Sequence, residues 1–201
     1  MELRVAQHVA CTESEGPGRR FALWVAGCSL RCPGCCNPEL FEGRHVAPRS
    51  VEPTVEAIAA ATDAYDIEGI TVLGGEPLDQ IEGVATLGRA VKGMGLGVIV
   101  FTGYTLAEAR QRPGFASLWR SLDTLVDGRY DPHRPEPPRG RMVVGSTNQR
   151  LHHASPRYAD PQRWQGPRSA ELQVAPDGTV TAVGTPREVA RLLKLVAAPS
   201  R

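Results

Sequence analysis

Four short apolar runs, separated by segments of helical periodicity, constrain the fold of this chain more than any other feature. They are apolar along their whole length, which is typical of strands buried on both faces, and they span residues 20–27, 69–75, 97–104 and 122–128. The intervening periodicity predicts helices over 54–65, 80–95 and 105–112. Such alternation predicts a parallel sheet covered by helices. The units are too few for a closed eight-stranded barrel, so we expect an open or partial α/β barrel.

The pattern changes after the fourth apolar run. Residues 129–141 are rich in Pro and Arg and predict a loop, while 142–150 predict a last strand and its turn. The composition of 156–169 indicates a linker. We therefore expect a first domain over residues 1–155.

Residues 156–201 form the second expected unit, a C-terminal extension of linker, hairpin and helix. The stretch "AELQVAPDGTVTAVGTP" (170–186) contains two alternating runs about the turn residues Pro176, Asp177 and Gly178, which is a strong hairpin signal. A helix with Pro186 near its start follows.

Length and charge bound the class of protein. The chain has 201 residues, enough for one domain with a buried core. Its formal charge of +1 argues against a general nucleic-acid or membrane-surface binder, because both need a strong basic excess. No apolar run is long enough to span a membrane, and the N-terminus lacks a signal-peptide pattern. We expect a cytoplasmic protein, in which clustered cysteines indicate metal or redox chemistry rather than disulfides.

Four of the five cysteines lie between residues 28 and 36. The spacing Cys28-x3-Cys32-x2-Cys35 offers three thiolates in one loop, whereas a structural zinc site usually draws four ligands from two separate pairs. Three thiolates suit a four-iron cluster in which one iron keeps an open position for a substrate. On spacing alone, a zinc knuckle and buried reduced thiols remain alternatives.

The cysteine spacing after a first strand, with "GGEP" (74–77) after the next, resembles the radical S-adenosylmethionine (SAM) superfamily. Within that superfamily the chain is similar to the activating proteins of anaerobic ribonucleotide reductases and other glycyl radical enzymes. The matching blocks are "EGPGRRFALWVAGCSLRCPGCCNPELF" (15–41), "LGGEPL" (73–78), "FTGYTL" (101–106), "LVDGRY" (125–130) and "GSTNQR" (145–150). The resemblance covers about residues 12–150 and implies a partial radical SAM barrel, to which this chain adds its hairpin–helix extension.

The resemblance implies a [4Fe–4S] cluster held by Cys28, Cys32 and Cys35, with the amino and carboxylate groups of SAM on the open iron. An electron passed into SAM would release methionine and a 5′-deoxyadenosyl radical, which takes a hydrogen atom from a glycine of a partner enzyme. The implied partners are a glycyl radical enzyme or another macromolecular substrate, and reduced flavodoxin or ferredoxin as the electron donor.

Four residues after the second strand are the expected SAM contacts. Gly74 and Gly75 lack side chains, so the backbone can approach the ligand closely. The carboxylate of Glu76 would accept a hydrogen bond from the methionine ammonium, and Pro77 would stiffen the turn.

Further candidates follow later strands, because ligands of parallel sheets lie beyond the carboxyl ends of the strands. Thr102 and Asp127 either line the SAM site or act as structural caps and turns. Ser146 and Asn148 either bind SAM or close a turn.

Two cysteines are expected outside the cluster. Adjacent residues of an extended chain point to opposite sides, so Cys36 should not share a cluster with Cys35 and should pack as a small apolar residue. Cys11 precedes the first core strand and should be dispensable for the cluster.

Two other functions stay open at this stage. A radical SAM maturase would act on a peptide, an RNA or a small molecule, with the C-terminal extension as its recognition element. A non-catalytic iron–sulfur or zinc adaptor would keep the cysteine loop without turning over SAM.

Overall fold

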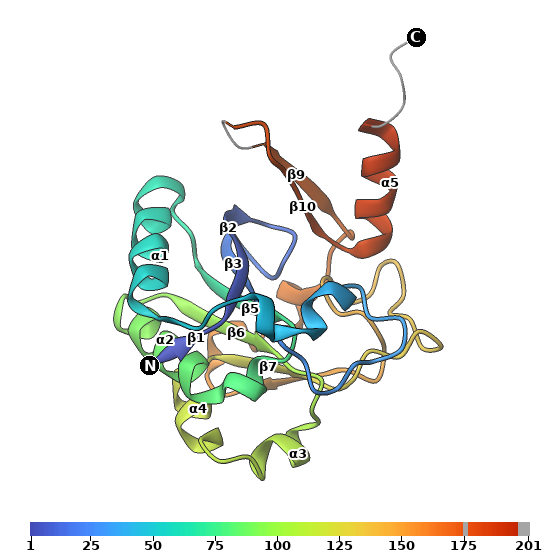
Figure 1. The fold of residues 1–201 in the computed structure, drawn as a ribbon. Helices are drawn as coiled ribbons and strands as arrows, with labels where there is room; N and C mark the ends of the chain where they lie inside the picture. Colours follow the sequence, from blue (N-terminus) through green and yellow to red (C-terminus); the bar gives the residue numbers. More distant parts are fainter. Residues whose placement is uncertain (175–176, 197–201) are drawn as a thin grey trace.

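A computed structural model describes residues 1–174 and 177–196 (Figure 1). The helices are α1 (Glu52–Tyr65), α2 (Ile81–Gly93), α3 (Leu106–Arg110), α4 (Phe115–Ser121) and α5 (Pro186–Val196). The strands are β1 (Glu2–Leu3), β2 (Val5–Thr12), β3 (Arg20–Val25), β4 (Arg49–Ser50), β5 (Gly69–Gly74), β6 (Gly97–Phe101), β7 (Thr124–Asp127), β8 (Arg150–His153), β9 (Ala170–Val174) and β10 (Val180–Gly184). Single 3-10 turns are η1 (Pro38–Phe41), η2 (Gly43–His45), η3 (Pro77–Gln80), η4 (Pro156–Tyr158) and η5 (Pro161–Trp164).

The central sheet is mixed, with strand order β2-β3-β5-β6-β7-β8. The four predicted strands β3, β5, β6 and β7 are parallel neighbours, as their apolar composition indicated. The flanking strands β2 and β8 are antiparallel to the strands they join. The predicted parallel sheet is thus present in these four strands, while the two edge strands make the whole sheet mixed, and the fold shown is mixed α/β. Only a short loop separates β2 from β3, which suffices for an antiparallel connection but not for a crossover.

The last strand begins later than predicted. No strand forms over 142–149, although Ser146 makes one isolated bridge with Pro135. Val143 has a left-handed φ of 57°, and the side chain of Gln149 accepts hydrogen bonds from the backbone of Gly145 and Ser146, each at 3.0 Å. These contacts turn the chain before β8, which starts at Arg150.

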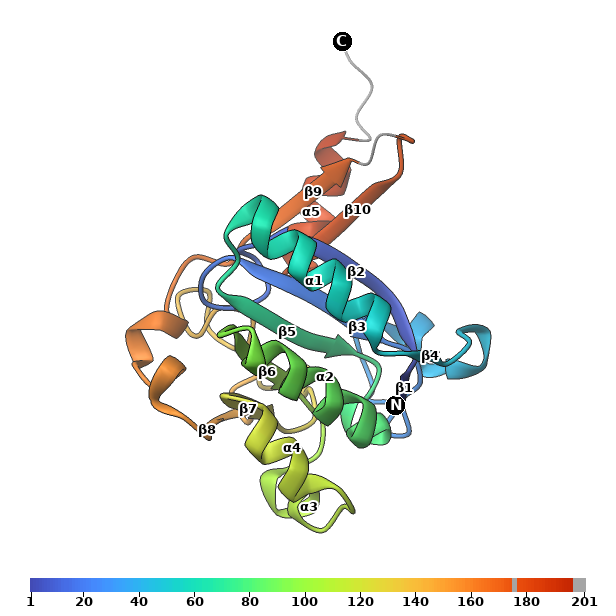
Figure 2. The same cartoon turned by 90° about the vertical axis from the view of Figure 1, so that its left-hand side faces the viewer.

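Helices α1, α2 and α4 cover one face of this sheet, and Figure 2 looks onto that face. The core between them contains aliphatic side chains from the four parallel strands and from the helices, among them Leu23, Ile70, Val98, Ile58 and Leu118, each at most 1% exposed. Helix α4 was not predicted from the sequence, yet Leu118 and Ser121 are buried against α2. Burial of these side chains holds the four parallel strands together, so that their carboxyl ends lie at one edge of the sheet.

The opposite face is covered by the segment that the sequence indicated as a linker. Tyr158 and Trp164 are 0% and 1% exposed and pack on Ile99 of β6 and Val126 of β7. The Trp164 indole donates to the carbonyl of Tyr158 at 2.8 Å. Residues 156–164 are therefore part of the core of the protein.

Arg20, at the start of β3, is completely buried beside Tyr158. Its guanidinium donates to Thr71 Oγ1 at 2.6 Å, to the Tyr158 hydroxyl at 2.9 Å and to the carbonyl oxygens of Pro17 and Ile70. Burial lowers the pKa of this guanidinium, while the Tyr158 hydroxyl opposes the shift. Neutral oxygen atoms thus accept the hydrogen bonds of a buried cation. The guanidinium in turn links Tyr158 to β3 and β5.

The C-terminal hairpin and α5 stand out from the body at the top of Figure 1. Strands β9 and β10 pair in the predicted hairpin, and α5 packs on both of them. The predicted turn includes Pro176, which lies outside the described residues. Val183 of β10 packs with Trp24 of β3 in a small cluster, and Leu40 of the cysteine-bearing segment packs against the same cluster. The hairpin therefore shares this cluster with the segment that carries the cysteines.

Polar contacts complete the attachment of the hairpin. Glu171 of β9 accepts hydrogen bonds from the backbone of Glu13 at 2.9 Å and from the hydroxyl of Ser14 at 2.8 Å. Glu15 is 7% exposed and accepts from the backbone of Gly184 at 2.7 Å, and burial raises its pKa to about 7.

Within the described residues, no helix is both long enough and apolar enough to cross a bilayer.

We propose that the boundary expected at 155/156 lies later, near residue 168. Truncation after Ser155 removes Tyr158 and Trp164 and should destabilise the protein by several kcal/mol, because loss of one large buried aromatic side chain costs about 3–5 kcal/mol. Truncation after Arg168 keeps both and should leave the sheet folded. Thermal unfolding and iron content after anaerobic reconstitution distinguish the two truncations. Equal stability of the two would place the boundary at 155/156.

Candidate functional site

The carboxyl ends of β3 and β5 are joined by backbone hydrogen bonds that continue beyond the strands. Gly75 N donates to Val25 O at 2.7 Å, and Glu76 N donates to Gly27 O at 2.8 Å. A Cβ atom at Gly75 would lie 2.2 Å from Gly27 O, and Gly74 has a left-handed φ of 109°. Only glycine fits this close approach. The "GGEP" turn and the start of the cysteine loop are thus brought side by side by strand pairing.

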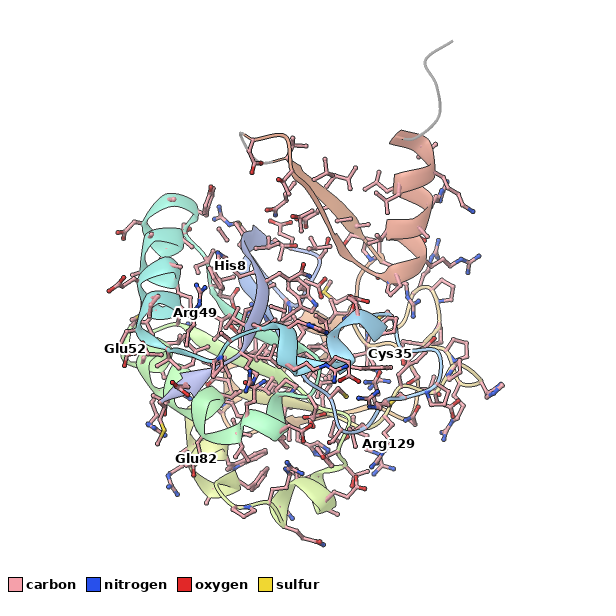
Figure 3. The ribbon with its side chains drawn as sticks, viewed as in Figure 1. His8, Cys35, Arg49, Glu52, Glu82 and Arg129 are labelled. Atoms are coloured by element: carbon pink, nitrogen blue, oxygen red, sulfur yellow. The ribbon has the colours of Figure 1, made fainter. Side chains whose placement is uncertain are left out.

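The cysteine loop lies outside the core. None of residues 27–50 is buried, and the thiols of Cys28, Cys32 and Cys35 are free and partly exposed. Cys28 N donates to Phe41 O at 3.2 Å, so the two ends of the loop come together, and Cys35 N donates to Cys32 O at 3.2 Å. Figure 3 shows Cys35 on the same side of the molecule as Arg129, which follows β7.

The chemistry of the donor set fits an iron–sulfur cluster. Three free thiols on one open loop match the three ligands required, although among the described residues no three Cys, His, Asp or Glu side chains are arranged to hold a metal ion. Burial raises the pKa of Cys28, with smaller contributions from the charges of Glu76 and Asp79. Binding to iron would therefore deprotonate this thiol.

Glu76 is the most constrained side chain beside the loop, with 1% exposure. Its Oε1 accepts hydrogen bonds from Leu78 N at 2.8 Å and Thr102 Oγ1 at 2.7 Å, and its Oε2 accepts from Gly103 N at 2.8 Å. Burial raises the pKa of this carboxyl group to about 7, and these three donors oppose the shift. Thr102 is therefore placed beside Glu76, as the sequence suggested. Pro77 is buried at the first position of η3.

The other predicted SAM residues bond parts of the chain other than Glu76. Asp127 is 5% exposed and accepts from Leu106 N at 2.5 Å, and its Oδ2 lies 3.0 Å from His152 Nε2. Asp127 and Asn148 line a depression of about 590 Å³, next to α3 and β8. Ser146 is 0% exposed and accepts from Asp131 N at 3.1 Å, which closes a turn. Hydrogen bonds thus join Glu76 to Thr102 and to the start of the cysteine loop, and the roles of Asp127, Ser146 and Asn148 stay predictions.

The two extra cysteines differ in their environments. Cys36 is exposed, so the expectation that it packs as a small apolar residue is wrong. It lies in the exposed loop, where no core is available to cover it. Cys11 lies in β2, half-buried next to the main core. That neither residue is a cluster ligand stays a prediction.

The sequence did not single out the side chains that hold the loop in place. Ser29 follows Cys28 directly, and both its backbone N and its hydroxyl donate to the carboxylate of Asp79, at 2.9 and 3.1 Å. Asp79 comes two residues after the "GGEP" motif. In the sequence, only the position of Asp79 just beyond that motif indicated that it could contribute to the site.

An α/β sheet with a cysteine loop and a glycine turn at its carboxyl edge is the arrangement that the resemblance to radical SAM iron–sulfur proteins implies. The sequence model of the 4Fe-4S single cluster domain family matches residues 14–152. The anaerobic ribonucleoside-triphosphate reductase-activating protein of Enterobacteria phage T4 is 30% identical over 145 residues, which are 70% of this chain and 88% of that protein. The protein of the same name from Salmonella typhi is 29% identical over 156 residues, 75% of this chain and 99% of that protein.

A shorter match joins the chain to a second kind of activating enzyme. The pyruvate formate-lyase-activating enzyme of Listeria monocytogenes is 36% identical over 70 residues, 34% of this chain and 28% of that enzyme. The chain belongs to the 4Fe-4S single cluster domain family, together with the anaerobic ribonucleoside-triphosphate reductase-activating proteins. The predicted resemblance and the predicted cofactors, a [4Fe–4S] cluster and SAM, are confirmed at the level of this family.

Glu76→Gln should weaken SAM binding while the cluster stays in place. The change removes the negative charge available to the methionine ammonium, and a charge-assisted hydrogen bond contributes about 1.5–3 kcal/mol, or roughly ten- to a hundredfold in affinity. Equilibrium binding of SAM to the reconstituted protein measures the effect. The matched control is Glu82→Gln, on the exposed side of α2. Unchanged affinity with an intact cluster would contradict the role of Glu76.

Single Cys→Ala variants should separate ligands from bystanders. We expect a full cluster to require each of Cys28, Cys32 and Cys35, because together they supply only the three thiolates that the cluster needs. Cys11→Ala and Cys36→Ala should retain it. Iron content and the absorption spectrum after anaerobic reconstitution provide the measurement. A cluster lost in Cys36→Ala but kept in Cys35→Ala would reverse the assignment.

Proposed function

We propose that this chain is a radical SAM activating enzyme that generates the glycyl radical of an anaerobic ribonucleotide reductase. Membership of the family supports this reaction, and the relatives' names supply the partner. The structural observation that carries the proposal is the strand-end junction, in which Glu76 N donates to Gly27 O at 2.8 Å, one residue from Cys28. That bond holds the expected SAM turn against the expected cluster loop.

The cluster and SAM, when bound, supply the reductive cleavage that yields a 5′-deoxyadenosyl radical. Cys28, Cys32 and Cys35 would hold the cluster, and Gly74, Gly75 and Glu76 would face the methionine end of SAM. Burial raises the pKa of Glu76 to about 7. A cation beside this carboxyl group lowers that pKa again, because the opposite charge stabilises the ionised form. Glu76 can thus become charged on binding and orient an ammonium group.

Leu30 helps to keep water from the Glu76 carboxylate. This residue lies between Cys28 and Cys32, and a Cβ atom at Gly103 would lie 2.5 Å from its Cδ1. Because Gly103 N donates to Glu76 Oε2, the Leu30 side chain packs over that hydrogen bond. Exclusion of water strengthens the electrostatic interactions of a buried carboxylate.

The surroundings of the loop favour a macromolecular substrate. The four parallel strands form an open sheet, which supports a partial rather than a closed barrel. The Pro- and Arg-rich loop 129–141 lies against the cysteine loop, since a Cβ atom at Gly34 would lie 3.6 Å from Pro132 Cβ. Both loops are largely exposed, so a loop of a partner enzyme could reach the thiols.

The proposed enzyme needs an electron donor and a reducing compartment. The electron donor is expected to be reduced flavodoxin or ferredoxin, because one-electron reduction of the cluster must precede cleavage of SAM. All five cysteines are free, which suits the reducing cytoplasm. Val183 of the hairpin belongs to a cluster against which Leu40 of the cysteine segment also packs, so the hairpin would bound the site on one side.

The test is anaerobic turnover of the reconstituted protein with SAM and dithionite, followed by addition of an anaerobic ribonucleotide reductase. We expect 5′-deoxyadenosine together with the electron paramagnetic resonance doublet of a glycyl radical, and neither with Cys32→Ala. Formation of 5′-deoxyadenosine without a glycyl radical would favour a maturase for another substrate. A bound cluster or zinc without cleavage of SAM would favour a non-catalytic adaptor.

A further inference from the structure

We propose that Asp79 and Arg112 form a charge pair that positions the cluster loop and sets the reduction potential of the cluster. The inference rests on the proposed function for the identity of the cofactor. It concerns two residues outside the "GGEP" motif and outside the three cysteines. Both are positioning residues, because they act on the loop through Ser29 and Tyr104.

One carboxylate collects hydrogen bonds from three parts of the chain. Asp79 Oδ2 accepts from Ser29 N at 2.9 Å, and its Oδ1 accepts from the hydroxyl of Ser29, the hydroxyl of Tyr104 and Arg112 Nη2, each at 3.1 Å. The hydroxyl groups of Ser29 and Tyr104 are 2.9 Å apart. Asp79 therefore ties the residue after Cys28 to the loops that follow β5 and β6.

Arg112 is held on Asp79 by a second set of contacts. Its Nε donates to Leu78 O at 3.1 Å, and its guanidinium lies over the Tyr104 ring, 4.4 Å from the ring centre. The side chains of Asp79 and Arg112 are 22% and 31% exposed. Contacts to a backbone carbonyl and an aromatic ring fix the guanidinium, so this pair has a defined geometry that most exposed ion pairs lack.

The position of the pair gives it two effects on a cluster bound at Cys28. Asp79 fixes the backbone of Ser29 and hence the direction of the neighbouring thiolate. A negative charge next to a cluster disfavours its reduction, and a positive charge favours it. The two charges partly cancel while both are present, so removing either one leaves the other uncompensated.

The test measures the midpoint potential of the cluster in two single variants of the full-length reconstituted protein, without SAM. Asp79→Asn should move the potential in the positive direction, because Arg112 stays. Arg112→Gln should move it in the negative direction, because Asp79 stays. Glu82→Gln is the matched control and should move neither the potential nor the spectrum. Figure 3 shows Glu82 on the opposite side of the molecule from Cys35.

A second measurement tests the positioning role. Asp79→Ala removes both carboxylate oxygens that hold Ser29 and should raise the Kd for SAM at least tenfold, with iron content and the thermal unfolding of the apoprotein close to wild type. Ser29→Ala keeps the charge pair and the bond from the backbone of residue 29 to Asp79, so it should leave both the potential and the Kd close to wild type.

The outcomes separate this inference from the proposed function. Shifts of the potential in the same direction, or none, in both charge variants would overturn the inference. Opposite shifts with unchanged SAM affinity in Asp79→Ala would overturn the positioning role. Failure of the wild-type protein to bind SAM would overturn the proposed function alone, because the potentials are measured without SAM.

Discussion

The parallel pairing of β3 with β5 is the interaction on which the rest of the site depends. The register pairs Val25 with Gly74, and the hydrogen bonds of Gly75 and Glu76 extend the ladder by two residues. Glycine is required there because a Cβ atom at Gly74 or Gly75 would overlap the backbone of the neighbouring strand or loop. A slip of one residue in this register would place Glu76 on the wrong side of the sheet.

Burial on both faces of the sheet holds that register. The helix face contributes aliphatic side chains, and the other face contributes Tyr158 and Trp164 from a segment that follows β8. Arg20 joins the two, since its guanidinium bonds both the strands and the Tyr158 hydroxyl. Lysine could not replace it, because one ammonium group cannot reach oxygens spread around a planar guanidinium.

The sequence predicted the parts of the fold that depend on local pattern. The four parallel strands have continuous apolar runs, and the segments between them have helical periodicity. It could not predict β8, because the contacts that delay this strand involve the side chain of Gln149, which bonds two backbone groups earlier in the chain. It also missed the burial of 156–164, where proline and arginine suggested a linker. Two large aromatic residues there, Tyr158 and Trp164, are buried in the core despite the polar residues around them.

The site shows the same division. Motif spacing located Cys28 and Glu76 but could not reveal Asp79, whose partners Ser29, Tyr104 and Arg112 meet only in three dimensions. Asp127 ends β7 and Asn148 precedes β8, and both line the depression next to α3, whereas Glu76 bonds Thr102. A position after a parallel strand therefore predicts the edge of the sheet on which a residue lies, but not the side chains that it contacts there.

The absence of any buried residue from 27 to 50 has a consequence for how the iron centre is made and repaired. In zinc fingers the metal supplies the folding free energy, so the chain unfolds when the metal is lost. Here the two faces of the sheet are closed by side chains from other segments, and the thiols take no part in the core. The polypeptide can therefore complete its folding first and receive its iron and sulfide afterwards. For the same reason, a centre destroyed by oxygen leaves a folded scaffold on which it can be rebuilt.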